Sequence, residues 1–156
     1  MVGNPVLKTN VDDASVFGPA VEVARGVSRL LLERGFSPLL EFTLPTGRRL
    51  DVAAISDTGD ITAVEIKVSI ADLRADEKWP EYLAYCDRYY FAVPEHFPVE
   101  ALPETHGLIV ADRFGAAIVR EARHFPVTPA RRKSLLIRFA RTAAERFARA
   151  SDPFAP

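Results

Sequence analysis

The chain has one cysteine, three histidines and no long apolar run, and each shortage excludes a class of protein. Cys86 alone cannot form an intramolecular disulfide or a cysteine-rich zinc site, so core packing is its expected use. The three histidines have no metal-ligand spacing. Without a secretory signal or an apolar stretch long enough to span a bilayer, we expect a cytoplasmic protein with no membrane partner. No nucleophile elbow, phosphate loop or nucleotide-binding glycine pattern is present.

The length and composition predict one packed domain. A chain of 156 residues with 48% hydrophobic content supports a single core. We expect a flexible leader over residues 1–15, one domain over 16–150 and a tail over 151–156. The net charge of −1 is unevenly distributed, because residues 113–149 contain ten Lys or Arg against two acids. Positive charge therefore concentrates towards the C-terminal end.

Hydrophobic periodicity and turn signals predict an α/β protein. The expected order is a helix that begins at Pro19 and ends at Gly35, three strands, a crossover helix, a strand, a hairpin and a long basic helix from Thr128. Residues 36–44, 51–56 and 60–68 form the first three strands, and the crossover helix covers 70–86 with a break at Pro80. That helix returns the chain for a parallel pairing, which predicts a mixed central sheet flanked by helices.

Two charged residues stand in a strand that otherwise looks buried. The strand that contains Glu65 and Lys67 is apolar and β-branched. Residues two apart share a face of a strand, so the carboxylate and the ammonium project together. Burial of both is costly unless a cation, a partner charge or a phosphate compensates them. An edge-strand salt bridge between Glu65 and an arginine is the ordinary alternative.

Asp51 begins the preceding strand, and the length of the connecting loop decides which way it faces. A two-residue loop places it opposite Ile66, on the wrong face. A three-residue loop over residues 57–59, with Gly59 at its left-handed position, places Asp51 opposite Glu65. The sequence therefore predicts that Asp51, Glu65 and Lys67 meet.

This pattern resembles a known nuclease signature. Asp51 followed fourteen residues later by Glu65-Ile66-Lys67 is similar to the PD-(D/E)XK motif, although Leu50 replaces the proline that often precedes the aspartate. More narrowly, the chain resembles the MmcB family of bacterial DNA repair proteins over roughly residues 20 to 147. The likeness is carried by residues 47–51, 64–69, 72–76, Lys78, Trp79, Tyr82, 86–93, 107–113 and 129–133. It implies a restriction-endonuclease-like core, a role in DNA repair and a homodimer as one arrangement, because resolvase-like relatives act as dimers.

The resemblance also implies a Mg²⁺ or Mn²⁺ cofactor. Mg²⁺ prefers oxygen ligands and retains several waters, so Asp51, Glu65 and the backbone carbonyl of Ile66 suffice as protein ligands. Lys67 is expected to orient the attacking water or to stabilise charge on the phosphate. Related nucleases often bring a glutamate of the first helix to the metal. Glu22 is the candidate for that role, with a solvated charge as its alternative.

Several cations are candidates for contact with DNA. Arg48 and Arg49 suit a phosphate clamp, and a salt bridge with Glu41 or Asp60 is the alternative. Lys78 follows the site by one helix, close to Trp79, for which core packing is the alternative to base stacking. The terminal helix adds seven cations against one acid, and either a solvated basic face or DNA contact explains them. Its candidate DNA-binding residues are Arg131, Arg132, Lys133 and Arg138.

Three functions are compatible with these features. The first is a Mg²⁺-dependent endonuclease that hydrolyses phosphodiester bonds in damaged or structured DNA. The second is a catalytically silent DNA-binding repair accessory with the same fold. The third is a protein-interaction domain that uses an aromatic surface between Trp79 and Tyr90.

Overall fold

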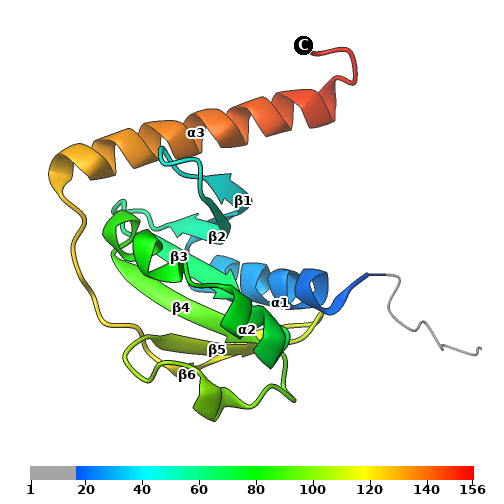
Figure 1. The fold of residues 1–156 in the computed structure, drawn as a ribbon. Helices are drawn as coiled ribbons and strands as arrows, with labels where there is room; N and C mark the ends of the chain where they lie inside the picture. Colours follow the sequence, from blue (N-terminus) through cyan, green and yellow to red (C-terminus); the bar gives the residue numbers. More distant parts are fainter. Residues whose placement is uncertain (1–16) are drawn as a thin grey trace, which may run out of the picture.

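Figure 1 shows the computed structural model, which describes residues 17–156. The predicted leader over residues 1–15 lies outside the described residues. The elements are α1 (Pro19–Glu33), β1 (Ser37–Thr43), β2 (Arg49–Ile55), β3 (Ile61–Ile66), α2 (Ile70–Ala75), η1 (Trp79–Tyr85), β4 (Arg88–Val93), η2 (Val99–Ala101), β5 (Gly107–Ala111), β6 (Ala116–Arg120) and α3 (Pro129–Ser151), where η denotes a 3-10 helix.

The strands form one mixed sheet in which spatial order follows chain order from β1 to β6. The pairs β1–β2, β2–β3 and β5–β6 are antiparallel, whereas β3–β4 and β4–β5 are parallel. This arrangement confirms the predicted α/β class, the mixed sheet with flanking helices and the C-terminal helix. Pro38 lies within β1, where its missing N–H is tolerated because β1 is an edge strand.

Each face of the sheet has its own apolar layer. On one face Val27 of α1 packs in a cluster with Val64 of β3. On the other face Phe91 of β4 belongs to a cluster that includes Leu135 and Phe139 of α3. Burial of each such side chain contributes roughly 1.5–3 kcal/mol. Because side chains alternate along β3, the residue after Val64 points away from the layer that contains α1.

The loop between β2 and β3 has the predicted form. Ser56 N–H donates to the carbonyl of Asp60 at 3.0 Å, so residues 57–59 form the three-residue loop. Gly59 has φ of 86°, the left-handed conformation that favours glycine. The register pairs Val52 with Val64. Carried one residue further, this register places Asp51 opposite Glu65, as the sequence predicted.

The crossover differs from the prediction of a helix over 70–86 that breaks at Pro80. The α-helix ends at Ala75, and the chain resumes as η1 at Trp79. Asp76 accepts a hydrogen bond from the backbone N–H of Lys78 at 3.0 Å, so its side chain stabilises a turn in place of the helix. Pro80 lies in the first turn of η1, where its missing N–H interrupts no helical hydrogen bond. The break therefore precedes the proline, between Ala75 and Trp79.

Helical spacing predicts that one face of the terminal helix is apolar and consists of Leu136, Phe139, Ala143, Phe147 and Ala150, and this is correct only for its first half. Phe139 is buried and Leu136 and Ala143 are half-buried, but Phe147 is 75% exposed and Ala150 is also exposed. The physical reason is length, since α3 continues past the sheet on which it packs (Figure 1). Among residues 17–156, no helix is both long and apolar enough to cross a membrane.

Candidate functional site

Asp51, Glu65 and Lys67 meet where β2 and β3 diverge. Glu65 is 5% exposed and Lys67 is 4% exposed, so both predicted charges are buried. Asp51 Oδ2 accepts a hydrogen bond from the backbone N–H of Ile66 at 2.8 Å. The Asp51 side chain thus replaces a backbone partner in the ladder. The three side chains that the sequence singled out lie together.

Asp76 joins this group as a residue that the sequence prediction missed. Lys67 Nζ lies 2.6 Å from Asp76 Oδ2 and 3.9 Å from Glu65 Oε1. Asp76 reaches the ammonium because α2 ends just before it. The Ser69 hydroxyl, which accepts from Asp72 N–H at 3.1 Å, fixes the start of this short helix. The signal in the sequence is Ser69 followed three residues later by Asp72, a capping pair that fixes where α2 starts.

Burial outweighs the attraction of Lys67 at one carboxylate, Glu65. Burial, and then repulsion by Asp51, raises the pKa of Glu65 to about 8. Glu65 Oε2 is buried and has no hydrogen-bond partner. Burial also raises the pKa of Asp51, although the Ile66 N–H opposes that change. Burial opposes ionisation of Asp76 as well, but hydrogen bonds, above all from Lys67, outweigh it and lower the pKa of Asp76.

A cavity of about 770 Å³ opens above these groups. Its acidic residues are Glu41, Asp51, Glu65, Asp72 and Asp76. Tyr82 of η1 also lines it, and burial together with the nearby carboxylate of Glu65 raises the pKa of that tyrosine to about 12. The phenol therefore stays protonated near neutral pH and is available as a donor.

The donor set fits a divalent cation. Carboxylate and carbonyl oxygens are the ligands that Mg²⁺ prefers. Glu65 Oε2 is a buried oxygen without a hydrogen-bond partner, so it is available to bind a cation. Lys67 N–H bonds to β4 through the Ala92 carbonyl at 2.9 Å. Successive peptide units alternate in direction along a strand, so the polar backbone groups of Ile66 point to the other side, towards Asp51. Asp51, Glu65 and the Ile66 carbonyl therefore stay the predicted ligands.

Glu22 is placed elsewhere. It is half-buried on α1 and is not one of the residues that line the cavity. It stands one helical turn before Gly26, which approaches the β5–β6 turn so closely that a Cβ there would overlap the carbonyls of Asp112 and Gly115. This face of α1 therefore looks towards that turn, and a metal role for Glu22 stays a prediction without support from the cavity.

A second acidic group lies near the start of α3. Asp60, Asp87 and His124 are the described residues whose ligand atoms come within 4.8 Å of one another. Arg132 already fills this position, because its guanidinium donates to both Asp87 oxygens at 2.7 and 2.6 Å. Asp87 also accepts from the backbone N–H groups of Ile61 and Val127. The group is satisfied internally and offers no open place for a metal ion.

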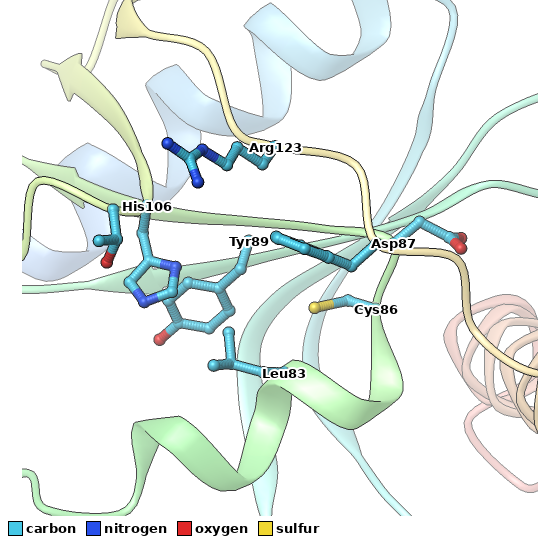
Figure 2. A pocket seen from close by; sticks show the side chains of 8 residues that line it. Leu83, Cys86, Asp87, Tyr89, His106 and Arg123 are labelled. Carbon is cyan, nitrogen blue, oxygen red and sulfur yellow. The ribbon is translucent and has the colours of Figure 1, made fainter.

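Figure 2 shows a further cavity, of about 350 Å³, on another part of the molecule. The Asp87 carboxylate points away from it towards α3, and Cys86 presents a thiol whose pKa burial raises to about 12. His106 stacks edge-on against Trp79 at 4.9 Å and against Tyr89 at 5.5 Å. The aromatic contacts support a packing role for Trp79, and the burial of Cys86 in the same apolar cluster supports the packing role expected of that residue.

The predicted DNA-binding cations separate into two sets. Arg48 is held by Glu81 at 3.0 Å, and Arg49 lies 3.8 Å from Glu41, which was the predicted alternative. Arg131 donates to the Ala84 carbonyl at 2.9 Å, and Arg132 is bound by Asp87 as described above.

The second set takes part in no ion pair between described residues and consists of Lys78, Lys133 and Arg138. Lys78 is the one of the seven predicted DNA-binding cations that lines the cavity. Two arginines that were not predicted, Arg25 and Arg146, line it as well.

The aromatic surface suggested for protein interaction is not a surface. Tyr82, Tyr89 and Tyr90 are buried, and Trp79 is half-buried against its neighbours. Their burial removes the observation on which that third function rested.

Comparison with known proteins gives a consistent result. The chain is similar to a solved protein of unknown function from Silicibacter pomeroyi, with 43% identity and a TM-score of 0.88 over 91% of this chain and 97% of that one. No curated protein matches. The profile of the family described as DNA repair protein MmcB-like matches residues 8–154. The chain therefore belongs to the MmcB-like family of DNA repair proteins.

Proposed function

We propose that the protein is a divalent-metal-dependent phosphodiesterase that cleaves damaged or structured DNA during repair. The observation that carries the proposal is the unpartnered, buried carboxylate oxygen of Glu65, which lies beside Asp51 and Lys67 in a cavity. An ordinary salt bridge satisfies both partners, whereas here Lys67 lies at 2.6 Å from Asp76 and only at 3.9 Å from Glu65 Oε1, and Glu65 Oε2 has no hydrogen-bond partner. A cation site explains why such a costly group is retained.

Each residue has a defined task in this proposal. Asp51, Glu65 and the Ile66 carbonyl would hold the cation. A bound divalent cation supplies a Lewis acid that stabilises charge on the phosphate and makes hydroxide available near neutral pH. Lys67 presents its ammonium to the charge that develops on the phosphate. Asp76 positions that ammonium through the 2.6 Å contact.

A DNA-binding accessory without turnover is the second candidate. The Lys67–Asp76 pair favours it, because the ammonium is held at 2.6 Å by one acid and is 3.9 Å from the candidate metal ligand. On this alternative, the Lys67–Asp76 ion pair stabilises the fold, and the charged groups of the cavity bind DNA without catalysing its cleavage.

Cleavage assays separate the two candidates. Duplex, flap and branched DNA are incubated with Mg²⁺ or Mn²⁺ and with wild type, Lys67→Ala or Glu65→Gln, while Arg29→Ala, an exposed cation outside the cavity, serves as the surface control. Loss of the charge-stabilising group is expected to lower the rate by roughly 10²–10³-fold, and the control is expected to cleave as wild type does. Thermal melts verify that each variant folds. Equal cleavage by wild type and Lys67→Ala would remove the mechanism, and tight binding without cleavage by any protein would favour the accessory.

A further inference from the structure

Cations from three distant parts of the chain line the cavity that contains the candidate metal ligands. Arg25 comes from α1, Lys78 from the segment between α2 and η1, and Arg146 from the outer half of α3. None of the three takes part in an ion pair between described residues. The site therefore combines acidic groups with positive charges that have no acidic partner of their own.

Arg146 reaches the cavity through an unusual feature of β1. Its guanidinium donates to the carbonyls of Leu40 and Glu41, the second at 2.8 Å. Glu41 has φ of 50°, the left-handed region that a non-glycine residue rarely adopts. The β1–β2 register carries Glu41 opposite Asp51, so this conformation lies beside a candidate metal ligand. Strained backbone of this kind clusters at functional sites.

The guanidinium of Arg146 keeps donors for a ligand. An arginine has five N–H donors, and the two backbone carbonyls take one each. The guanidinium carbon of Arg25 lies 4.2 Å from the centroid of the Phe17 ring, a cation–π contact that involves no carboxylate. Lys78 is exposed. All three side chains can therefore bind an anion without breaking an ion pair.

The pattern of charge fits one ligand chemistry. Asp51 and Glu65 suit a cation, while the three surrounding cations suit the negative oxygens of phosphates on either side of it. Several cations predicted to bind DNA are engaged elsewhere, since Arg132 is held by Asp87 and Arg48 by Glu81. DNA contact at the cavity thus depends on a different set of residues from the one that the sequence indicated.

We propose that Arg25, Lys78 and Arg146 form a phosphate-binding rim that seats the sugar–phosphate backbone of DNA over Asp51 and Glu65. This inference rests on the proposed function and deepens it, because it names the groups that position the substrate. It also assigns α3 a part in the site, since Arg146 brings the outer half of that helix to the cavity.

Binding measurements on full-length variants test the rim. Arg25→Ala, Lys78→Ala and Arg146→Lys are compared with Arg29→Ala, Arg74→Ala and Arg149→Ala, matched cations on α1, α2 and α3 that do not line the cavity. Fluorescence anisotropy follows single-stranded, duplex and branched oligonucleotides across a range of salt concentrations, with Ca²⁺ in place of Mg²⁺. Thermal melts accompany each variant, because Arg146 also binds the β1 backbone.

Each rim alanine variant is expected to bind more weakly and to lose about 0.9 from the slope of log K against log salt for duplex, or about 0.7 for a single strand. The matched controls are expected to keep the wild-type slope. Arg146→Lys is expected to keep the slope and lose affinity, because it retains the charge but not the fork of donors. The oligonucleotide whose affinity falls most in the rim variants identifies the DNA structure that the rim binds.

Two outcomes would contradict the rim proposal. In the first, the rim variants keep the same salt slope and affinity as the controls and the wild type. In the second, the wild type does not bind DNA. Cleavage measured in parallel with Mg²⁺ separates this inference from the proposed function. If cleavage depends on Lys67 but the rim variants bind and cleave as wild type does, the rim proposal is wrong and the phosphodiesterase proposal stands. If the rim variants lose salt slope but the wild type never cleaves DNA, the rim proposal stands and the phosphodiesterase proposal is wrong.

Discussion

The two oxygens of the Glu65 carboxylate have different surroundings. Oε1 lies 3.9 Å from the Lys67 ammonium, and Oε2 is buried without a partner. An unsatisfied buried acceptor costs about 1–3 kcal/mol. The residue therefore lowers the stability of the metal-free protein whenever it is ionised, and this cost can be measured.

The pKa of Glu65 predicts a pH dependence of stability. The folded pKa is raised from 4.5 to about 8, chiefly by burial, so the folded protein holds this proton more tightly than the unfolded chain does. The resulting stability is complete below the unfolded pKa and is lost as pH rises through the folded value. In EDTA, we expect the free energy of unfolding of wild type to fall relative to that of Glu65→Gln between about pH 5 and pH 8.

Urea denaturation of both proteins across this range measures the effect. Burial lowers the pKa of His106, which adds stability with rising pH, but it does so in both proteins and cancels in the comparison. Parallel curves for wild type and Glu65→Gln would contradict the prediction.

At the scale of the element, α3 is anchored by one buried ion pair at its start. The Asp87 side chain is fully buried, and its two oxygens accept from Arg132 and from the backbone N–H groups of Ile61 and Val127. Burial opposes ionisation of Asp87, yet the hydrogen bonds from Arg132 and from these backbone groups lower its pKa. One carboxylate thus joins the start of β3, the segment before α3 and the first turns of α3.

Removal of Arg132 tests this anchor. Because Arg132→Ala leaves Asp87 buried without its charge partner, we expect a loss of about 3–5 kcal/mol in the free energy of unfolding. The neighbouring exposed Lys133→Ala is expected to change it by less than about 0.5 kcal/mol. Chemical denaturation measures both, and Asp87→Asn/Arg132→Ala should lose less than the sum of the single variants. A small effect of Arg132→Ala would return this residue to the predicted DNA-binding set.

At the scale of the whole molecule, the acidic cavity links metal binding to folding. A cation that binds only the folded state stabilises it by RT ln(1 + [L]/Kd), about 2.7 kcal/mol at a hundredfold excess over Kd. We expect Mg²⁺ or Mn²⁺ to raise the melting temperature of wild type but not that of Asp51→Asn or Glu65→Gln.

Asp60→Asn is the matched control for metal binding, because Asp60 belongs to the acidic group that Arg132 fills. It should retain the full shift in melting temperature. A shift that survives in Glu65→Gln and disappears in Asp60→Asn would move the metal site to the start of α3.

Local sequence signals were sufficient to predict the strands of the sheet and the proximity of Asp51, Glu65 and Lys67. Gly59 and the three-residue loop set the β2–β3 register, and period-two alternation then places Glu65 and Lys67 on one face. These features depend on neighbours in sequence, so they could be predicted from residues alone. The same holds for the helix that begins at Pro19 and for the parallel return to β4.

Long-range packing decided the rest. Asp76 meets Lys67 because α2 ends early, and Arg146 reaches Glu41 across 105 positions because α3 lies along β1. Whether an arginine binds substrate or a buried carboxylate depends on which partners the folded chain brings within reach. The sequence by itself determined which strands form and how their side chains alternate. Only the tertiary structure decided which charges stay free at the cavity, since charge pairing acts between residues that the chain separates widely.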